Sequence, residues 1–155
     1  MGYADWYETT APAMKGALLA AGDNVDALNY LLQIGYCARI IDDIYDQDKK
    51  LTDVDVLDAF DLLVSRIPCN AFYQEHIKAL QPFQTLAWCG WQQANRLCKG
   101  SKTQRIYAHV YRDLIHEMYS TSGAMMGSGS GQIPKERNPE AHERYVRMRH
   151  DKQGL

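Results

Sequence analysis

The chain has 155 residues, of which 46% are hydrophobic and 23% charged, and its formal net charge is −2. With a mean hydropathy of −0.43, this composition excludes an extended disordered chain, a collagen-like fibre and a membrane-embedded bundle, and the small charge gives no electrostatic reason to bind nucleic acid or an anionic bilayer. No secretory signal and no run of about eighteen apolar residues occurs, so we expect a cytoplasmic protein without a membrane span.

Helical patterns begin close to the N-terminus. Residues 11–21 are expected to form a short helix, which Gly22 ends. From Val25 onward apolar residues recur at steps of three and four, which predicts one long helix as far as Asp46. The recurring positions are Leu28, Leu31, Leu32, Gly35, Ala38, Ile41 and Ile44.

Further helices are expected in the middle of the chain. Thr52 or Asp53 caps a helix that Ile67-Pro68 ends, and its apolar residues lie on one side: Val56, Leu57, Phe60, Leu63 and Val64. Residues 70–80 are helical in pattern, and Pro82 is expected to start a separate run. We expect a buried stripe on that run, made by Phe83, Leu86, Ala87, Gly90, Trp91, Ala94 and Leu97.

A last long helix is expected from Ser101 or Thr103 onward, because apolar residues again recur at helical spacing. No segment alternates with period two, so the fold class is predicted to be all-α, a compact helical bundle of five or six helices over residues 1–126. Residues 127–155 are expected to form a flexible Gly/Ser break and a basic tail. The four cysteines include no CxxC pair and are expected to be buried as small apolar side chains.

The central motif is acidic, since eight of the thirteen aspartates lie between Asp42 and Asp61. Asp42, Asp43 and Asp46 end the long helix at spacings that let their carboxylates project from one face. Like charges repel there, at the negative end of the helix dipole. Mg²⁺ is commonly held by one or two carboxylates together with the phosphates of a ligand. The cluster therefore indicates either a site for Mg²⁺ and a diphosphate or an acidic surface that only faces water. The remaining aspartates Asp53, Asp55, Asp58 and Asp61 are expected to be caps and first-turn charges of the next helix.

Residues 38–46, A-R-I-I-D-D-I-Y-D, resemble the first aspartate-rich motif of class I isoprenoid synthases, particularly the squalene and phytoene synthase branch. The resemblance covers residues 20–61. It implies an all-α bundle like a trimmed isoprenoid-synthase fold, whose central cavity holds a prenyl diphosphate through bridging Mg²⁺ ions. It also implies that Asp42, Asp43 and Asp46 are the metal ligands and that Arg39 is a partner of the diphosphate or of a carboxylate.

The family requires a second acidic motif on a later helix. The candidates here are Asp113 and Glu117, four residues apart on the last long helix, with Arg112 as a further substrate-binding residue. The same helix places His109, Asp113 and His116 in one stripe, which suits a transition-metal site as well as an ordinary polar surface. The aromatic groups, Tyr3, Trp6 and Tyr7 and then Trp88 and Trp91, are expected either to line an apolar cavity or to pack in the core.

Three functions remain open from the sequence. The first is a Mg²⁺-dependent diphosphate-binding protein of the isoprenoid-synthase kind, with catalytic residues unassigned. The second is an all-α nucleoside triphosphate pyrophosphohydrolase, which the chain resembles in having acidic pairs at Asp23/Asp26 and Asp43/Asp46. The third is a non-enzymatic helical assembly protein, such as a phage or accessory subunit. We expect the protein to form a homo-oligomer, in which a cavity can draw residues from two chains.

Overall fold

The computed structural model describes residues 2–10, 15–47, 49–112, 121–122 and 125. Helices dominate these ranges and no strand occurs in them, which confirms the predicted all-α fold class. None of the helices in this part of the chain is long and apolar enough to cross a membrane. The expected tail, residues 127–155, lies outside the described residues.

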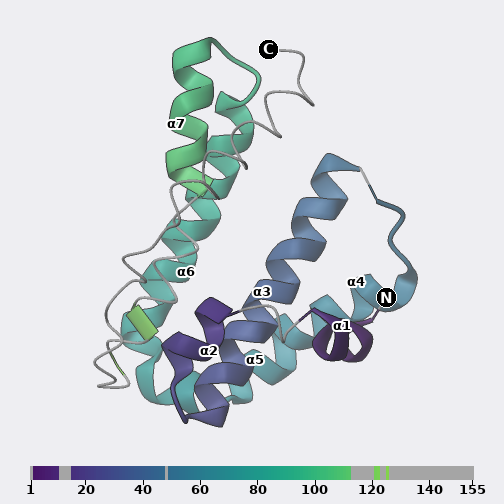
Figure 1. Cartoon of the computed structure of the whole chain (residues 1–155), viewed down its shortest axis with the longest axis vertical. Coiled ribbons are helices and arrows are strands. Elements are labelled where there is room, and N and C mark those ends of the chain that lie inside the picture. Colours follow the sequence, from purple (N-terminus) through teal and green to yellow (C-terminus); the bar gives the residue numbers. More distant parts are fainter. Residues whose placement is uncertain (1, 11–14, 48, 113–120, 123–124, 126–155) are drawn as a thin grey trace.

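The long helix α3, Val25–Asp46, is the element on which most others pack (Figure 1). It begins because the side chain of Asn24 accepts a hydrogen bond from the backbone N–H of Ala27 at 2.8 Å. Helix α2, Lys15–Ala21, packs against α3 and ends at Gly22, whose φ of 56° is easy only for glycine. The sequence pattern predicts the bounds of α3 and the end of α2 correctly.

Helix α1, Tyr3–Thr9, has no signal in the sequence pattern. Aromatic contacts hold it in place, because the rings of Tyr3 and Trp6 meet the ring of Tyr36 edge-on, with centroids 5.2 and 5.4 Å apart. The backbone N–H of Tyr3 also donates to the carboxylate of Asp58 at 2.7 Å. So short a helix is marginal by itself, and its packing on α3 and α4 stabilises it.

A helical stretch along α3 consists of α4 (Asp53–Asp61), the π turn η2 (Leu62–Arg66) and α5 (Ile67–Cys69). Thr52 caps it as expected, in a reciprocal capping box with Asp55. The stretch runs past its expected end at Ile67-Pro68. The reason is the π turn: the backbone N–H of Ile67 donates to the carbonyl of Leu62, so the chain has left the regular α-helical ladder before the proline.

The apolar side of α4 and η2 is exposed and is not part of the buried core of the described residues. Helix α4 packs inward through the buried residues Asp55 and Ala59, and the thiol of Cys37 donates to the backbone carbonyl of Ala59 at 3.6 Å. Only a small residue at position 59 permits so close an approach of two helices. The residues left outside are Val56, Leu57, Phe60, Leu63 and Val64, which are between 43% and 66% exposed.

Helix α6, Ala71–Leu97, is a single helix, so the expected break at Pro82 is wrong. Proline removes one backbone hydrogen bond from a helix interior and crowds the preceding turn. Helix α6 continues through Pro82, and α3, α5 and α7 pack against parts of the helix. Packing thus outweighs a local signal that would end an isolated helix.

Helix α7, Lys102–Arg112, returns beside α6 (Figure 1). Its start lies where expected, because Ser101 and Gln104 exchange two hydrogen bonds, from the backbone of each to the side chain of the other. On the facing part of α6, Gly90 and Ala94 are buried as expected. Leu86 is 51% exposed, which corrects its assignment to the buried stripe.

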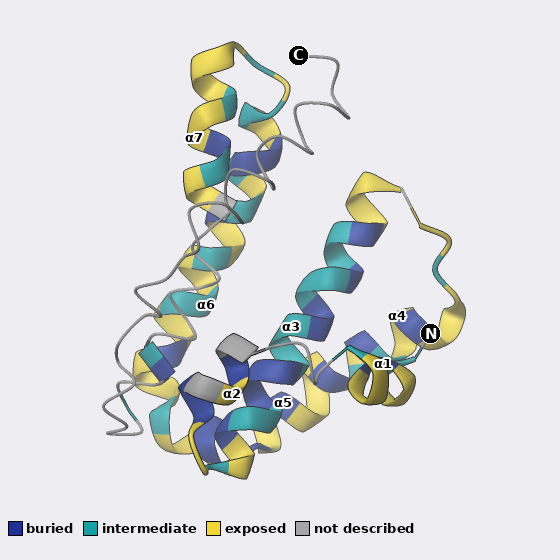
Figure 2. Cartoon of the chain, in the orientation of Figure 1, coloured by how far each residue is buried: buried dark blue, intermediate teal, exposed yellow. Residues whose placement is uncertain are grey.

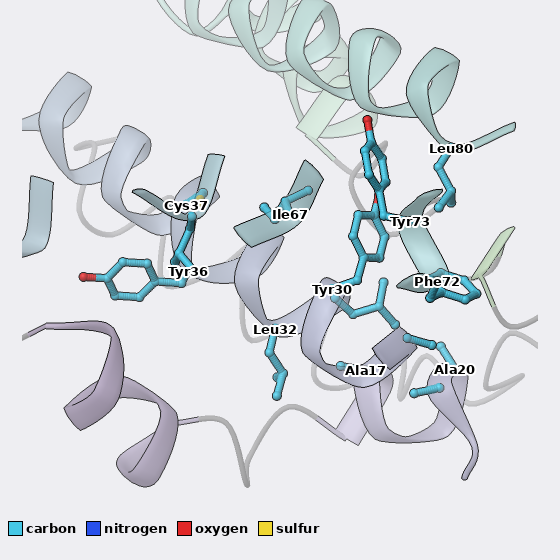
Figure 3. Close-up of a cluster of buried hydrophobic side chains, with 14 of the residues drawn as sticks. Ala17, Ala20, Tyr30, Leu32, Tyr36, Cys37, Ile67, Phe72, Tyr73 and Leu80 are labelled. Carbon is cyan, nitrogen blue, oxygen red and sulfur yellow. The ribbon is translucent and has the colours of Figure 1, made fainter. Parts of the chain in front are cut away.

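The core lies where α2, the first half of α3 and the start of α6 converge, as the dark-blue residues in Figure 2 show. Tyr30 packs against both Phe72 and Tyr73, with ring centroids 5.8 and 5.4 Å away (Figure 3). Cys37 is buried, but Cys69 and Cys89 are exposed, so the expectation that all four cysteines are buried is wrong.

Changing Gln47 to glycine is expected to raise the free energy of unfolding by about 0.5–1 kcal/mol. Gln47 ends α3 with a φ of 52°. This left-handed conformation costs a residue with a Cβ about 1–2 kcal/mol and costs glycine almost nothing. The larger chain entropy that glycine loses on folding offsets part of this gain. Urea unfolding measures the change. Gln92 is exposed inside α6, and glycine there should lower stability by about 1 kcal/mol. A loss of stability at both positions would contradict the prediction.

Candidate functional site

The three aspartates that end α3 have different surroundings. Asp43 is 5% exposed, Asp42 is half-buried and Asp46 is exposed. Successive residues on a helix point about 100° apart, so Asp42 and Asp43 face different neighbours. Within the described ranges, no group of three His, Cys, Asp or Glu side chains is placed to hold a metal ion. The structure therefore does not bring the three carboxylates of the acidic motif together at one point.

Asp43 is the centre of a network of ion pairs. Its Oδ2 accepts a hydrogen bond from Nη1 of Arg39 at 3.1 Å, and its Oδ1 accepts one from Nζ of Lys49 at 3.2 Å. Nη2 of Arg39 lies 3.8 Å from Oδ1 of Asp55 on α4. Both oxygens of Asp43 thus have a cationic partner from the chain itself. Arg39 contacts carboxylates here, which is one of the two roles that the family resemblance implies for it.

Asp55 ties this network to the start of α4. Its Oδ2 accepts from the backbone N–H of Thr52 at 2.8 Å and from the Thr52 hydroxyl at 2.7 Å. Burial works to raise the pKa of Asp55, but the hydrogen bonds from Thr52 outweigh it and hold the pKa below its ordinary value. The hydroxyl of Tyr36 donates to the backbone carbonyl of Asp55 at 3.4 Å. Asp55 is therefore one of the first-turn charges that the sequence predicts, paired with the cap Thr52 and with Arg39 as an added partner.

Asp42 turns instead toward α6. Its Oδ1 accepts a hydrogen bond from Nε1 of Trp91 at 3.0 Å. The Trp91 ring stacks on Trp88, with centroids 5.2 Å apart, and meets Tyr45 edge-on at 5.3 Å. Nζ of Lys99 lies 5.7 Å from the centroid of the Tyr45 ring. The acidic end of α3 is thus joined to the last turns of α6 by one carboxylate, three aromatic rings and a cation.

An apolar cavity of about 470 Å³ lies between α3 and α6, and η2 and α5 complete its wall. Its lining consists of Ile34, Cys37, Ala38, Ile41, Leu63, Ile67, Pro68, Tyr73, Gln84, Ala87, Trp88 and Trp91. Trp88 is 45% exposed, so the cavity opens to solvent on its side. This volume is in the range of pockets that hold small ligands. Trp88 and Trp91 therefore line a cavity, which is the first of the two roles expected for them.

The cavity has polar groups at both ends. Away from Asp42, the hydroxyl of Tyr73 donates to the side-chain carbonyl of Gln84 at 3.1 Å, and the amide of Gln84 donates to the hydroxyl of Tyr30 at 3.1 Å. The three groups satisfy one another, so none needs a ligand. At the other end, Ile41 and Trp91 lie beside the carboxylate of Asp42. A ligand with an apolar chain and one polar end would fit this cavity, with the chain along the apolar lining and the polar end near Asp42.

The remaining predicted site residues are not brought to this site by the described structure. Asp113, His116 and Glu117 lie outside the described residues, as does the side chain of Arg112. His109 is half-buried on α7.

The acidic pair of the pyrophosphohydrolase hypothesis lies far from the site. Asp26 stands at the start of α3 and Asp43 near its end, which at 1.5 Å per residue separates them by about 26 Å. One chain therefore does not place the two acidic pairs side by side.

Sequence reasoning did not identify Lys49, Tyr45, Gln84 or Lys99 as parts of the site. Lys49 lies between two helices and carries no periodic signal, so only the fold brings it to Asp43. Tyr45 and Lys99 are far apart in sequence and meet because α3 and α6 run side by side near Trp91. A search for aromatic and basic residues within one turn of the acidic motif would have found Tyr45. Comparisons with protein-family models, curated proteins and solved structures gave no match to this chain.

Proposed function

We propose that this protein binds an amphiphilic diphosphate together with Mg²⁺, with the apolar chain in the cavity and the diphosphate at the acidic end of α3. The observation that carries the proposal is the position of the cavity: Ile34, Ala38 and Ile41 line it along one face of α3, and that face leads to Asp42. An apolar chain would bury against these residues and against the two tryptophans. A prenyl diphosphate has this combination of chain and head.

The described carboxylates suit Mg²⁺ with a phosphate ligand better than Mg²⁺ alone. Asp42 and Asp46 are four residues apart on one helix face, which offers two carboxylates, and Mg²⁺ is commonly held by one or two carboxylates plus phosphate oxygens. Asp43 already has two cationic partners. We therefore assign the metal to Asp42 and Asp46, with Asp113 and Glu117 as the proposed ligands of the second motif.

Cations at the same end of α3 suit the diphosphate. Lys49 is 60% exposed on its side chain and Arg39 is 27% exposed, so both can contact an anionic ligand as well as Asp43. These cations would repel Mg²⁺ that binds alone, and the carboxylates would repel a diphosphate that binds alone. Each ligand offsets the repulsion that the other meets, so the two should bind jointly. Binding is the function proposed, and an activity that ionises the diphosphate would need no protein nucleophile because the metal stabilises the leaving group.

The test is a thermal melt of the full chain with Mg²⁺, pyrophosphate, farnesol and farnesyl diphosphate, separately and in combination. Mg²⁺ with farnesyl diphosphate at a hundred times the dissociation constant should stabilise by about 2.7 kcal/mol, a rise in Tm of about 5–10 °C. Pyrophosphate with Mg²⁺ should give a smaller rise, and farnesol should act without Mg²⁺.

Two variants separate the head from the chain. Asp46→Asn should abolish the effect of Mg²⁺ with pyrophosphate but keep that of farnesol, because Asp46 lies away from the cavity lining. Ala38→Phe should abolish the effect of farnesol but keep that of Mg²⁺ with pyrophosphate, because the larger side chain fills the cavity. Its control is Ala79→Phe, on an exposed position of α6. No rise with any ligand, or rises that neither Asp46→Asn nor Ala38→Phe reduces, would refute the proposal.

A further inference from the structure

One side of α4 and η2 is apolar and exposed. We call it the α4 face and define it by Val56, Leu57, Phe60, Leu63 and Val64. Leu57 and Phe60 are 66% and 65% exposed, although Leu and Phe are among the residue types most often buried. Their spacing of three and four residues gathers them on one side of a single helical stretch.

An apolar surface of this kind is costly to leave in water. Monomeric proteins rarely expose large contiguous apolar patches, and those that do use them as interaction sites. Within the described residues, α4 buries its opposite side through Asp55 and Ala59, so the α4 face adds nothing to the core of the chain. These exposed apolar side chains are therefore available to a partner.

The charges around the α4 face indicate which partner. Asp53 is exposed at the start of the stretch. Arg66 is exposed near its end, where its Nε donates to Oδ2 of Asp61 at 2.7 Å and its other guanidinium N–H groups can bind a second carboxylate. Phe60 lies seven residues after Asp53, roughly 10 Å along an α-helix, and six residues before Arg66, a slightly shorter distance because η2 is a π turn. In a contact about a two-fold axis, a residue of one copy that contacts a second residue of the other copy has that contact repeated with the copies exchanged. Two α4 faces packed antiparallel about Phe60 would thus set Asp53 of each copy beside Arg66 of the other.

The same charges disfavour a membrane as the partner. Helices that lie on anionic lipid carry Lys and Arg along their polar side. The α4 stretch instead carries Asp53, Asp58 and Asp61 beside its apolar residues. An acidic rim would be repelled by anionic lipid.

We propose that the α4 face is the docking surface for a second copy of this chain, packed antiparallel about a two-fold axis at Phe60. The apolar residues supply the affinity, and the Asp53–Arg66 pairs set the register. This does not depend on the ligand proposed above, since only Leu63 belongs to both the α4 face and the cavity lining. Failure of ligand binding would leave the self-association intact.

Sedimentation equilibrium of the full chain tests the proposal. The wild type should be a dimer, and Phe60→Glu should weaken association at least about tenfold, because central aromatic residues dominate interfaces. Phe60 is exposed, so the variant should keep its helical circular dichroism. Ile106→Glu is the matched control, because Ile106 is 58% exposed on α7 and should have no effect.

Charge reversal tests the register. In an Asp61→Asn background, which removes the partner of Arg66 within its own chain, Asp53→Arg alone and Arg66→Asp alone should each weaken the dimer. Combining the two should restore it, because the reversed residues again meet opposite charges across the axis. In a parallel arrangement each residue would meet its own copy, and the double variant would restore nothing.

Several results would overturn the proposal. These are a wild type that stays monomeric at high concentration, a dimer that Phe60→Glu leaves intact, and a double variant that restores nothing. A monomer whose α4 backbone is protected from hydrogen exchange would assign the α4 face to another part of the same chain. A monomer that binds anionic vesicles through Phe60 would assign it to lipid.

Discussion

Replacing Asp43 with asparagine should lower the free energy of unfolding by about 3 kcal/mol. The side chain of Asp43 is 5% exposed and accepts from Arg39 and Lys49. Removal of one partner from a buried ion pair costs about 3–5 kcal/mol, because the remaining charge is left uncompensated. The lower end applies because Arg39 keeps Asp55 at 3.8 Å and Lys49 is largely in solvent. Urea unfolding at neutral pH measures the loss.

The matched control for this change is Asp46→Asn. Asp46 is exposed at the C-terminal end of the same helix, where a negative charge is unfavourable to the helix dipole, so its removal should be neutral or slightly stabilising. Equal losses at the two positions would show that Asp43 has no special partners. A double variant of Asp43→Asn with Arg39→Met should lose less than the sum of the two single losses, because the two residues act as one unit.

The second large effect is expected at high pH. Burial raises the pKa of Tyr3, Tyr36 and Cys37 to about 12 each. An unfolded tyrosine or cysteine loses its proton at a lower pH, so the folded state holds these protons more tightly. Their contribution to stability is therefore complete below about pH 9 and is lost as the pH rises toward 12. The free energy of unfolding should fall by about 1.4 kcal/mol per pH unit for each proton that only the folded state retains.

Urea unfolding at a series of pH values from neutral to 12 measures this slope. Tyr36→Phe should make the slope shallower, because one ionisable group is removed at the same volume and its hydroxyl bond is long, at 3.4 Å. Tyr107→Phe is the control, since Tyr107 is 57% exposed on α7. A slope that the two variants change equally would contradict the assignment to buried groups.

The helix boundaries could be predicted where a side chain caps the backbone. Asn24 and Thr52 each accept a backbone hydrogen bond within three residues, and Gly22 supplies the left-handed turn after α2. Such signals are local, so the sequence contains them in full. Pro82 shows the limit, because the helix continues through it on the strength of packing against elements far away in the sequence.

The sequence could not show which side of α4 is buried. Its apolar residues suggest Phe60, but the contact with α3 uses Ala59, because a small side chain lets the helices approach closely. The contacts of the acidic motif could not be predicted either. The spacing of Asp42 and Asp43 is visible in the sequence, but their partners are not: Trp91, which contacts Asp42, comes from a distant segment, and Lys49 reaches Asp43 from the turn after α3.

The placement of the three tryptophans gives the molecule separate optical reporters. Trp6 is buried beside Tyr36, whereas Trp88 and Trp91 are stacked at the cavity. The Trp91 indole has a carboxylate as its hydrogen-bond acceptor, so its emission maximum and quenching should respond to events at Asp42. Emission from Trp6 instead follows the docking of the first helix. With Trp6 changed to phenylalanine, the tryptophan fluorescence of the chain would come from the cavity alone.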